Sequence, residues 1–113
     1  MIAKPIIWNE KENDSDYVFG NQPSRSIKYH PGDEKCWQAH QGNGTFLGET
    51  IGFYKTLKEA KEAYQIYDDA EIYVQLSDTM AGFMEMELPS SYVTKMRDMI
   101  KKMNIKGRRS TYE

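Results

Sequence analysis

Residues 56–69 restrict the fold of this chain most, because they combine a helix start with a helical apolar stripe. Thr56 and Glu59 have the spacing of a capping box, in which the threonine accepts from a main-chain amide and the glutamate reaches back to the cap. Apolar side chains then recur at the first, fourth, eighth and eleventh positions, namely Leu57, Ala60, Tyr64 and Tyr67. This spacing predicts an amphipathic helix that ends at Asp68 and Asp69.

The segments before this helix predict antiparallel strands. The dipeptide Asn43-Gly44 is a strong hairpin signal, so the strands on either side of it should pair. In the strand that follows it, we expect Leu47, Ile51 and Phe53 to share one face. The long polar segment 9–24 predicts a loop anchored by residues 17–19. The expected strands cover residues 2–8 (at a sheet edge, because of Pro5), 26–30, 35–41 and 45–54.

The segments after the helix predict the same order again. Residues 72–76 and 84–88 alternate between apolar and polar types, which indicates two strands joined by a loop. Ser90 or Ser91 can cap a final helix, whose apolar stripe consists of Val93, Met96, Ile100 and Met103. The predicted class is therefore α+β, with an antiparallel sheet of five to six short strands and two amphipathic helices (56–69 and 90–104) packed on one face, as ββα repeated twice.

Size and composition predict a single domain over residues 1–113, with 105–113 as a flexible basic tail. A chain of 113 residues has the length of one compact domain. One cysteine excludes an internal disulfide. No apolar run approaches the roughly 18 residues of a membrane span, and the first residues lack the pattern of a signal peptide. We therefore expect a soluble, cytoplasmic protein without membrane contacts.

The net charge of −2 conceals an uneven distribution. Residues 1–94 carry eight Lys/Arg and fifteen Asp/Glu, whereas residues 95–113 carry seven Lys/Arg and two Asp/Glu. The basic end binds nucleic acid or an acidic partner, folds back on the acidic body, or only keeps the chain soluble, and the pattern leaves these alternatives open. For nucleic acid, the candidate residues are Lys101, Lys102, Lys106, Arg108 and Arg109.

The residue types that carry catalysis or bind metals do not form a known constellation in this sequence. His30, Cys36 and His40 lack the spacing of zinc ligands, and on a strand Cys36 and His40 would lie about 13 Å apart. Paired carboxylates such as Asp14 and Asp16 lack the other residues of a calcium loop. Phosphate-binding and nucleophile-elbow motifs do not occur. We therefore expect a protein that is not an enzyme and has neither catalytic residues, nor a metal, nor a cofactor.

Residues 37–64 resemble the DNA-binding units of the AP2 and integrase-arm type. The shared pattern is Trp37-x-Ala39, then Gly44, then residues 51–64 with Gly52, Phe53 and Thr56 before an alanine-rich helix. The resemblance implies a three-stranded sheet followed by a helix, with DNA contacts made from the sheet. The matching strand positions in this chain are Lys35, Gln38, His40, Thr45 and Glu49.

The function that these observations favour is binding of a protein partner. Eight tyrosines, two tryptophans and seven methionines are more than a small core requires, and these types are enriched in interfaces. Size and the lack of catalytic motifs are typical of a phage or mobile-element accessory protein that inhibits a host factor. Nucleic-acid binding by the basic end is the alternative. The sequence leaves open whether the chain forms a homo-oligomer. The expected partner-binding residues are Tyr17, Phe19, Tyr29, Tyr54, Tyr73, Asp68 and Asp69.

Overall fold

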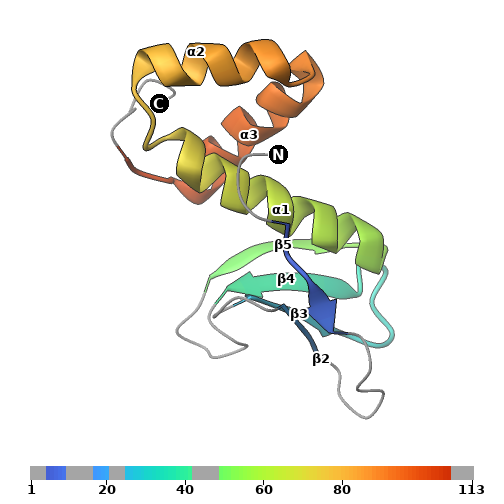
Figure 1. Cartoon of the computed structure of the whole chain (residues 1–113). Coiled ribbons are helices and arrows are strands. Elements are labelled where there is room, and N and C mark those ends of the chain that lie inside the picture. The colour runs from blue at the N-terminus through green and yellow to red at the C-terminus, as the bar shows by residue number, and fades with distance from the viewer. Residues whose placement is uncertain (1–4, 10–16, 21–24, 42–48, 108–113) are drawn as a thin grey trace. The chain divides into compact units, whose positions relative to one another are not determined.

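The fold was analysed in a computed structural model, which describes residues 5–9, 17–20, 25–41 and 49–107. The chain divides into two compact units. The sheet unit comprises Pro5–Tyr64, and the helical unit comprises Gln65–Glu113 together with Met1–Lys4. Helix α1 (Leu57–Tyr73) begins in the sheet unit and ends in the helical unit (Figure 1).

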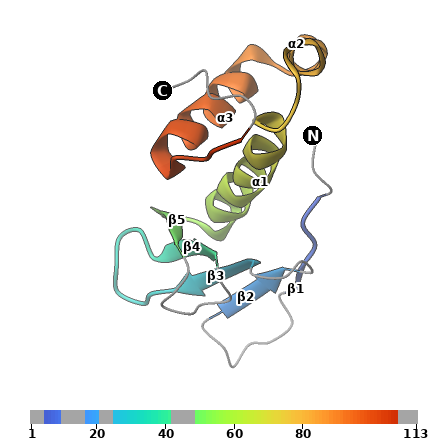
Figure 2. The same cartoon turned by 90° about the vertical axis from the view of Figure 1, so that its left-hand side faces the viewer.

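The sheet unit is built on five antiparallel strands in the order β1-β2-β3-β4-β5 (Figure 2). Neighbours along the chain are also neighbours in the sheet, so each strand pairs with the next one. The strands are β1 (Trp8–Asn9), β2 (Tyr17–Gly20), β3 (Arg25–Tyr29), β4 (Trp37–Gln41) and β5 (Thr50–Tyr54). The predicted α+β class with an antiparallel sheet is confirmed.

The two faces of the sheet differ in polarity. Ile27 pairs with Ala39, and both are fully buried, so their side belongs to the core and is called the apolar face. Lys28 pairs with Gln38, one position along, and therefore lies on the opposite side, called the polar face. Position 20 on β2 is a glycine because the packing there is close: a Cβ at Gly20 would lie 2.9 Å from Cγ2 of Ile6.

A β-bulge between β4 and β5 changes which side chains point into the core. The pairing shifts between Ala39 and His40, so that Ile51 is an extra residue on β5. Ile51 is fully buried, whereas Phe53 is 47% exposed. The prediction that these two side chains share a face is wrong, because it assumed a regular alternation through the strand.

The first part of α1 covers the apolar face of the sheet. Thr56 caps the helix as predicted: its Oγ1 accepts from the amide of Glu59 at 3.1 Å. Tyr64, which is fully buried, donates from its hydroxyl to the main-chain oxygen of His40 at 2.9 Å. Its ring meets Trp8 edge-on at 5.5 Å between centroids. The predicted apolar stripe of this helix is therefore the element that closes the core of the sheet unit.

The helical unit contains the end of α1 and two further helices, α2 (Asp78–Glu87) and α3 (Ser90–Met103). Its core is apolar and draws on all three helices. The buried side chains are Tyr67, Ala70, Tyr73, Val74, Ala81, Val93, Met96, Met99 and Ile100. The final helix is confirmed, although Pro89 rather than a serine occupies its N-cap and no side chain caps it.

Several predicted elements are wrong. Residues 72–73 belong to α1, which does not end at Asp69, and residues 84–87 belong to α2, so the second ββα repeat does not exist. In the segment expected to be one long loop, residues 17–20 form β2. The predicted first strand is short, since among residues 5–9 only Trp8 and Asn9 are in a strand.

The chain beyond α3 packs back on the end of α1. Asn104, with a φ of 52°, ends the helix in the left-handed conformation, and its amide bonds to the carbonyls of Ile100 and Lys101. A Cβ at Gly107 would lie only 2.7 Å from Cγ2 of Val74, so a larger residue would not fit there. Residues 105–107 of the predicted flexible tail thus belong to the helical unit, and residues 108–113 lie outside the described residues.

A candidate protein-binding surface on helix α2

Helix α2 exposes three large apolar side chains on one face. Met80 is 56% exposed, Phe83 is 61% exposed and Met86 is 81% exposed. They are spaced three residues apart, which places them next to one another along one side of the helix. We call these three residues the outer stripe. Contiguous apolar surface of this kind marks interaction sites in soluble proteins, whereas single exposed apolar residues are ordinary.

The opposite side of α2 faces the interior of the helical unit. Ala81 is fully buried, and Met84, Glu85 and Leu88 are half-buried. These positions have the spacing of a helical face, so the helix has already used one side for folding. The outer stripe is therefore surplus to the packing of α2 on its own unit.

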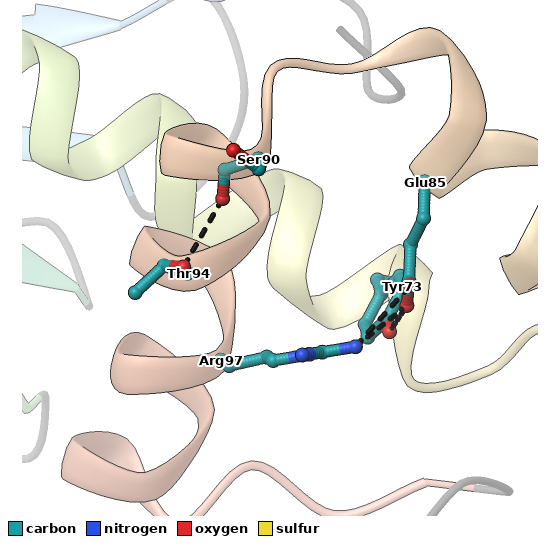
Figure 3. A network of polar contacts seen from close by, with 5 residues as sticks. All are labelled: Tyr73, Glu85, Ser90, Thr94 and Arg97. Atoms are coloured by element: carbon teal, nitrogen blue, oxygen red, sulfur yellow. Dashed lines mark hydrogen bonds and ion pairs between the residues drawn. The ribbon is translucent and has the colours of Figure 1, made fainter.

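A polar network ties α2 to its two neighbouring helices (Figure 3). The hydroxyl of Tyr73 on α1 donates to Oε2 of Glu85 on α2. Arg97 on α3 reaches the same carboxylate, with its guanidinium nitrogen 3.1 Å from Oε2 and 3.2 Å from Oε1. One carboxylate thus joins all three helices, and this attachment holds the outer stripe on a rigid element.

Among the described residues of the sheet unit, the two exposed aromatic side chains lie apart. Phe19 is 42% exposed and Phe53 is 47% exposed, and both lie on the polar face. They belong to β2 and β5, which are separated by two other strands and hence by about 14 Å. The space between them carries polar side chains. Oε1 of Gln38 accepts from Nε2 of His30 at 2.7 Å, and its amide nitrogen donates to the hydroxyl of Thr50 at 2.6 Å.

Two of the predicted partner-binding tyrosines lie in a row on the apolar face. Tyr29 on β3 stacks on Trp37 at 4.7 Å between ring centroids, and Trp37 pairs with Tyr54 on β5. All three are half-buried. Tyr17 is in β2, and its side chain lies outside the description. These residues and Phe19 are all in the sheet unit, but no single patch unites them.

Three other predicted partner-binding residues are not at the surface. Tyr73 and Asp69 are fully buried, and Asp68 is 4% exposed. The carboxylates were expected at a helix end, but α1 continues past them to Tyr73. Asp69 accepts hydrogen bonds from the hydroxyl of Tyr92 and from Nε2 of Gln65. The expectation of a surface position is wrong because these polar groups are satisfied inside the helical unit.

The contact between Tyr92 and Asp69 has a consequence at alkaline pH. Burial raises the pKa of Tyr92 above its ordinary value, and the hydrogen bond to Asp69 and the charge of Asp69 raise it further. The folded protein therefore keeps this proton at a pH where the unfolded chain has lost it. As the pH rises above about 10, the free energy of unfolding is expected to fall, since only the unfolded state gains from the ionisation.

The variant Tyr92→Phe is expected to show a shallower decline of unfolding free energy between about pH 9 and 11 than the natural chain. Chemical denaturation at a series of pH values measures it. Tyr54→Phe is a second test of the same linkage and should also show a shallower decline, because burial and the charge of Glu59 raise the pKa of Tyr54 as well. Identical pH profiles for the natural chain and Tyr92→Phe would contradict the assignment.

The residues predicted to bind nucleic acid lie at the end of α3 and beyond it. Lys101 and Lys102 are exposed in its last turn, where the helix dipole favours cations, and Lys106 is exposed three residues past the helix. Arg108 and Arg109 lie outside the described residues. Of the strand positions given by the DNA-binding resemblance, Gln38 and His40 are on the polar face, Lys35 and Glu49 are exposed, and Thr45 is outside the description.

Within residues 5–9, 17–20, 25–41 and 49–107, His, Cys, Asp and Glu side chains form no group of three that could hold a metal ion. Over the same residues, no helix has the length and apolar character to cross a membrane. Cys36 is a half-buried free thiol, as expected, with its sulfur 3.9 Å from the main-chain oxygen of Lys55.

The outer stripe is not apparent from the sequence, because residues 77–82 predict a loop and residues 84–88 predict a strand. Two signals for the helix were present. Ser77 followed by Asp78 is a typical helix start, and the Ser77 hydroxyl indeed accepts from the amide of Met80. The inner face of α2 also has helical spacing, but one of its members is Glu85, which hid the apolar pattern.

Comparison of the chain with protein-family models, with curated proteins and with solved structures gave no match.

Proposed function

We propose that this chain is a non-enzymatic binding protein that recognises a protein partner through the outer stripe of α2. The observation that carries the proposal is the exposure of Met80, Phe83 and Met86 side by side on a helix whose other face is already packed. Aromatic and methionine side chains are enriched at interfaces, and a few such residues usually provide most of the binding energy. Inhibition of a host factor, as expected of a phage accessory protein, is the biological setting that we propose.

The rigidity of the stripe supports this choice over the aromatic residues of the sheet. The network of Tyr73, Glu85 and Arg97 holds α2 from both neighbouring helices. A surface that is ordered before binding loses less conformational freedom when the partner docks. Methionine side chains on that surface can adapt to the shape of a partner, because they are unbranched and polarizable.

The test is a comparison of two phenylalanine variants in the full chain. Phe83→Ser removes the centre of the outer stripe, and Phe53→Ser removes another exposed ring, 47% exposed against 61% for Phe83, from the sheet. The partner captured from the cytosol of the source cells should be retained by the natural chain and by Phe53→Ser. Phe83→Ser should bind it at least about 30-fold more weakly, as expected for a central interface residue.

Thermal unfolding of the three proteins serves as the control for folding. Phe83 is mostly exposed, so its replacement should leave the unfolding temperature nearly unchanged. Undiminished capture by Phe83→Ser would contradict the proposed surface. For the alternative, nucleic-acid binding, retention of an oligonucleotide that falls steeply with salt and is lost on truncation after Asn104 would favour the basic end instead.

A further inference from the structure

Two exposed residues on the outer side of α2, Gly82 and Glu87, are types that a helix disfavours at their positions. The first is Gly82, in the middle of the helix. Glycine is less favourable than alanine in a helix interior, yet a Cβ at this position would meet no described atom within 4 Å. Internal packing in the described part of the chain therefore gives no reason for glycine here.

The position of Gly82 is suited to contact with a second helix. Thr79, Gly82, Phe83 and Met86 have the spacing of one helical face, and all four are exposed. The distance between two packed helices depends on the size of the side chains at the crossing point. A glycine beside Phe83 therefore lets the backbone of a partner helix come close. Phe83 and Met86 would then pack against the sides of that partner helix.

The second residue is Glu87, which is exposed in the last turn of α2. The helix dipole disfavours a carboxylate there, and the last turn of α2 contains no basic residue. Glu87 also lies four positions after Phe83 and is therefore its neighbour on the outer side. A cation on a docked partner would offset the unfavourable charge and lie next to the aromatic anchor.

The charge of α2 also argues against a second copy of this chain as the occupant. The helix carries Asp78, Glu85 and Glu87 and no lysine or arginine. The charge of Glu85 is matched within the chain by Arg97 of α3. Two copies of α2 packed antiparallel would bring Asp78 of one copy close to Glu87 of the other, which is repulsive.

We propose that the outer side of α2 binds an amphipathic helix of a partner protein, with an apolar face that crosses at Gly82 and a Lys or Arg that pairs with Glu87. This inference rests on the protein-binding function proposed above. It has a distinctive consequence. The natural residues at positions 82 and 87 serve binding at the expense of folding, so their replacement should weaken binding and stabilise the helix.

The experiment uses two synthetic helical peptides with the same leucine stripe. One carries lysine and arginine beside the stripe, and the other carries glutamate at those positions. Fluorescence anisotropy with the full chain should show binding of the basic peptide on the order of tenfold or more tighter than of the acidic peptide. Gly82→Ala and Glu87→Gln should each weaken binding of the basic peptide several-fold, and each should raise the unfolding temperature. Phe83→Ser should abolish binding of both peptides.

Each other outcome overturns a defined part of the proposal. If both peptides bind with equal affinity and Phe83→Ser abolishes this binding, the inference of a basic partner is wrong. The proposed protein-binding surface would then still stand. If Gly82→Ala leaves binding unaffected, the inference that the two helices cross closely at Gly82 is wrong. A dimer in sedimentation that Phe83→Ser dissociates would make a second copy the occupant. If neither peptide binds, the amphipathic-helix inference is wrong, and the capture experiment with Phe83→Ser decides the proposed function separately.

Discussion

Replacing Tyr64 with alanine is expected to lower the free energy of unfolding by about 3–5 kcal/mol, the range for loss of a large buried aromatic side chain. Tyr64 is fully buried, its ring contacts Trp8 edge-on, and Arg25 lies 5.8 Å above the ring. Its hydroxyl also bonds to the main-chain oxygen of His40 on β4. Alanine would remove all these contacts and leave a cavity between α1 and the apolar face of the sheet. Urea denaturation followed by circular dichroism measures the loss.

The matched control is Tyr64→Phe, which keeps the ring and removes only the hydroxyl. The carbonyl of His40 also accepts from Oγ of Ser26 at 3.0 Å, so it stays hydrogen-bonded without Tyr64. We therefore expect a cost of only about 1 kcal/mol for the phenylalanine variant. If the two variants lose equal stability, the hydroxyl rather than the packed ring holds α1 on the sheet.

Replacing Glu85 with alanine is expected to cost about 2–3 kcal/mol, because it leaves a buried hydroxyl without its acceptor. Tyr73 is fully buried and donates to Glu85, and Arg97 bonds to both oxygens of the same carboxylate. Removal of this side chain would loosen α2 from both of its neighbours. Urea denaturation measures this loss of unfolding free energy. Binding through the outer stripe should also weaken, because α2 is held less firmly in Glu85→Ala.

Two further variants separate the contributions to this network. The side chain of Arg97 is 42% exposed, so water can replace its partner, and Arg97→Ala should cost no more than about 1 kcal/mol. Glu85→Gln keeps an acceptor for Tyr73 and should fall between the two alanine variants. A larger loss in Arg97→Ala than in Glu85→Ala would show that the ion pair, not the tyrosine contact, attaches α2.

The elements that could be predicted from the sequence are those with strong local signals. The helix at residue 57 starts with a capping box that uses only Thr56 and Glu59, and its stripe packs as expected. Strands β4 and β5 pair across the segment that contains Asn43-Gly44. Helix α3 carries the apolar spacing expected of it, with Val93, Met96 and Ile100 buried. In each case the information lies within a few residues of the element.

The candidate site was not predicted because the local signals in the α2 segment conflict, with a helix start at Ser77 and a strand-like alternation after it. Residues 84–88 alternate between apolar and polar types, and this pattern fits a strand as well as the inner face of a helix. The helical alternative requires Glu85 to lie on the packed side. That is acceptable only because Tyr73 and Arg97, each 12 residues away in sequence, satisfy its carboxylate. The outer stripe follows from this orientation.

The sequence by itself determined the α+β class, the pairing of β4 with β5, the start of α1 and the position of α3. Only the tertiary structure decided which carboxylates are buried, how the bulge at Ile51 changes the face of β5, and which side of α2 is exposed. For the buried carboxylates and for the orientation of α2, the physical reason is the same. A polar group can lie inside when a partner satisfies it, as Tyr92 does for Asp69 across 23 residues, and residue patterns along the chain do not contain that partner.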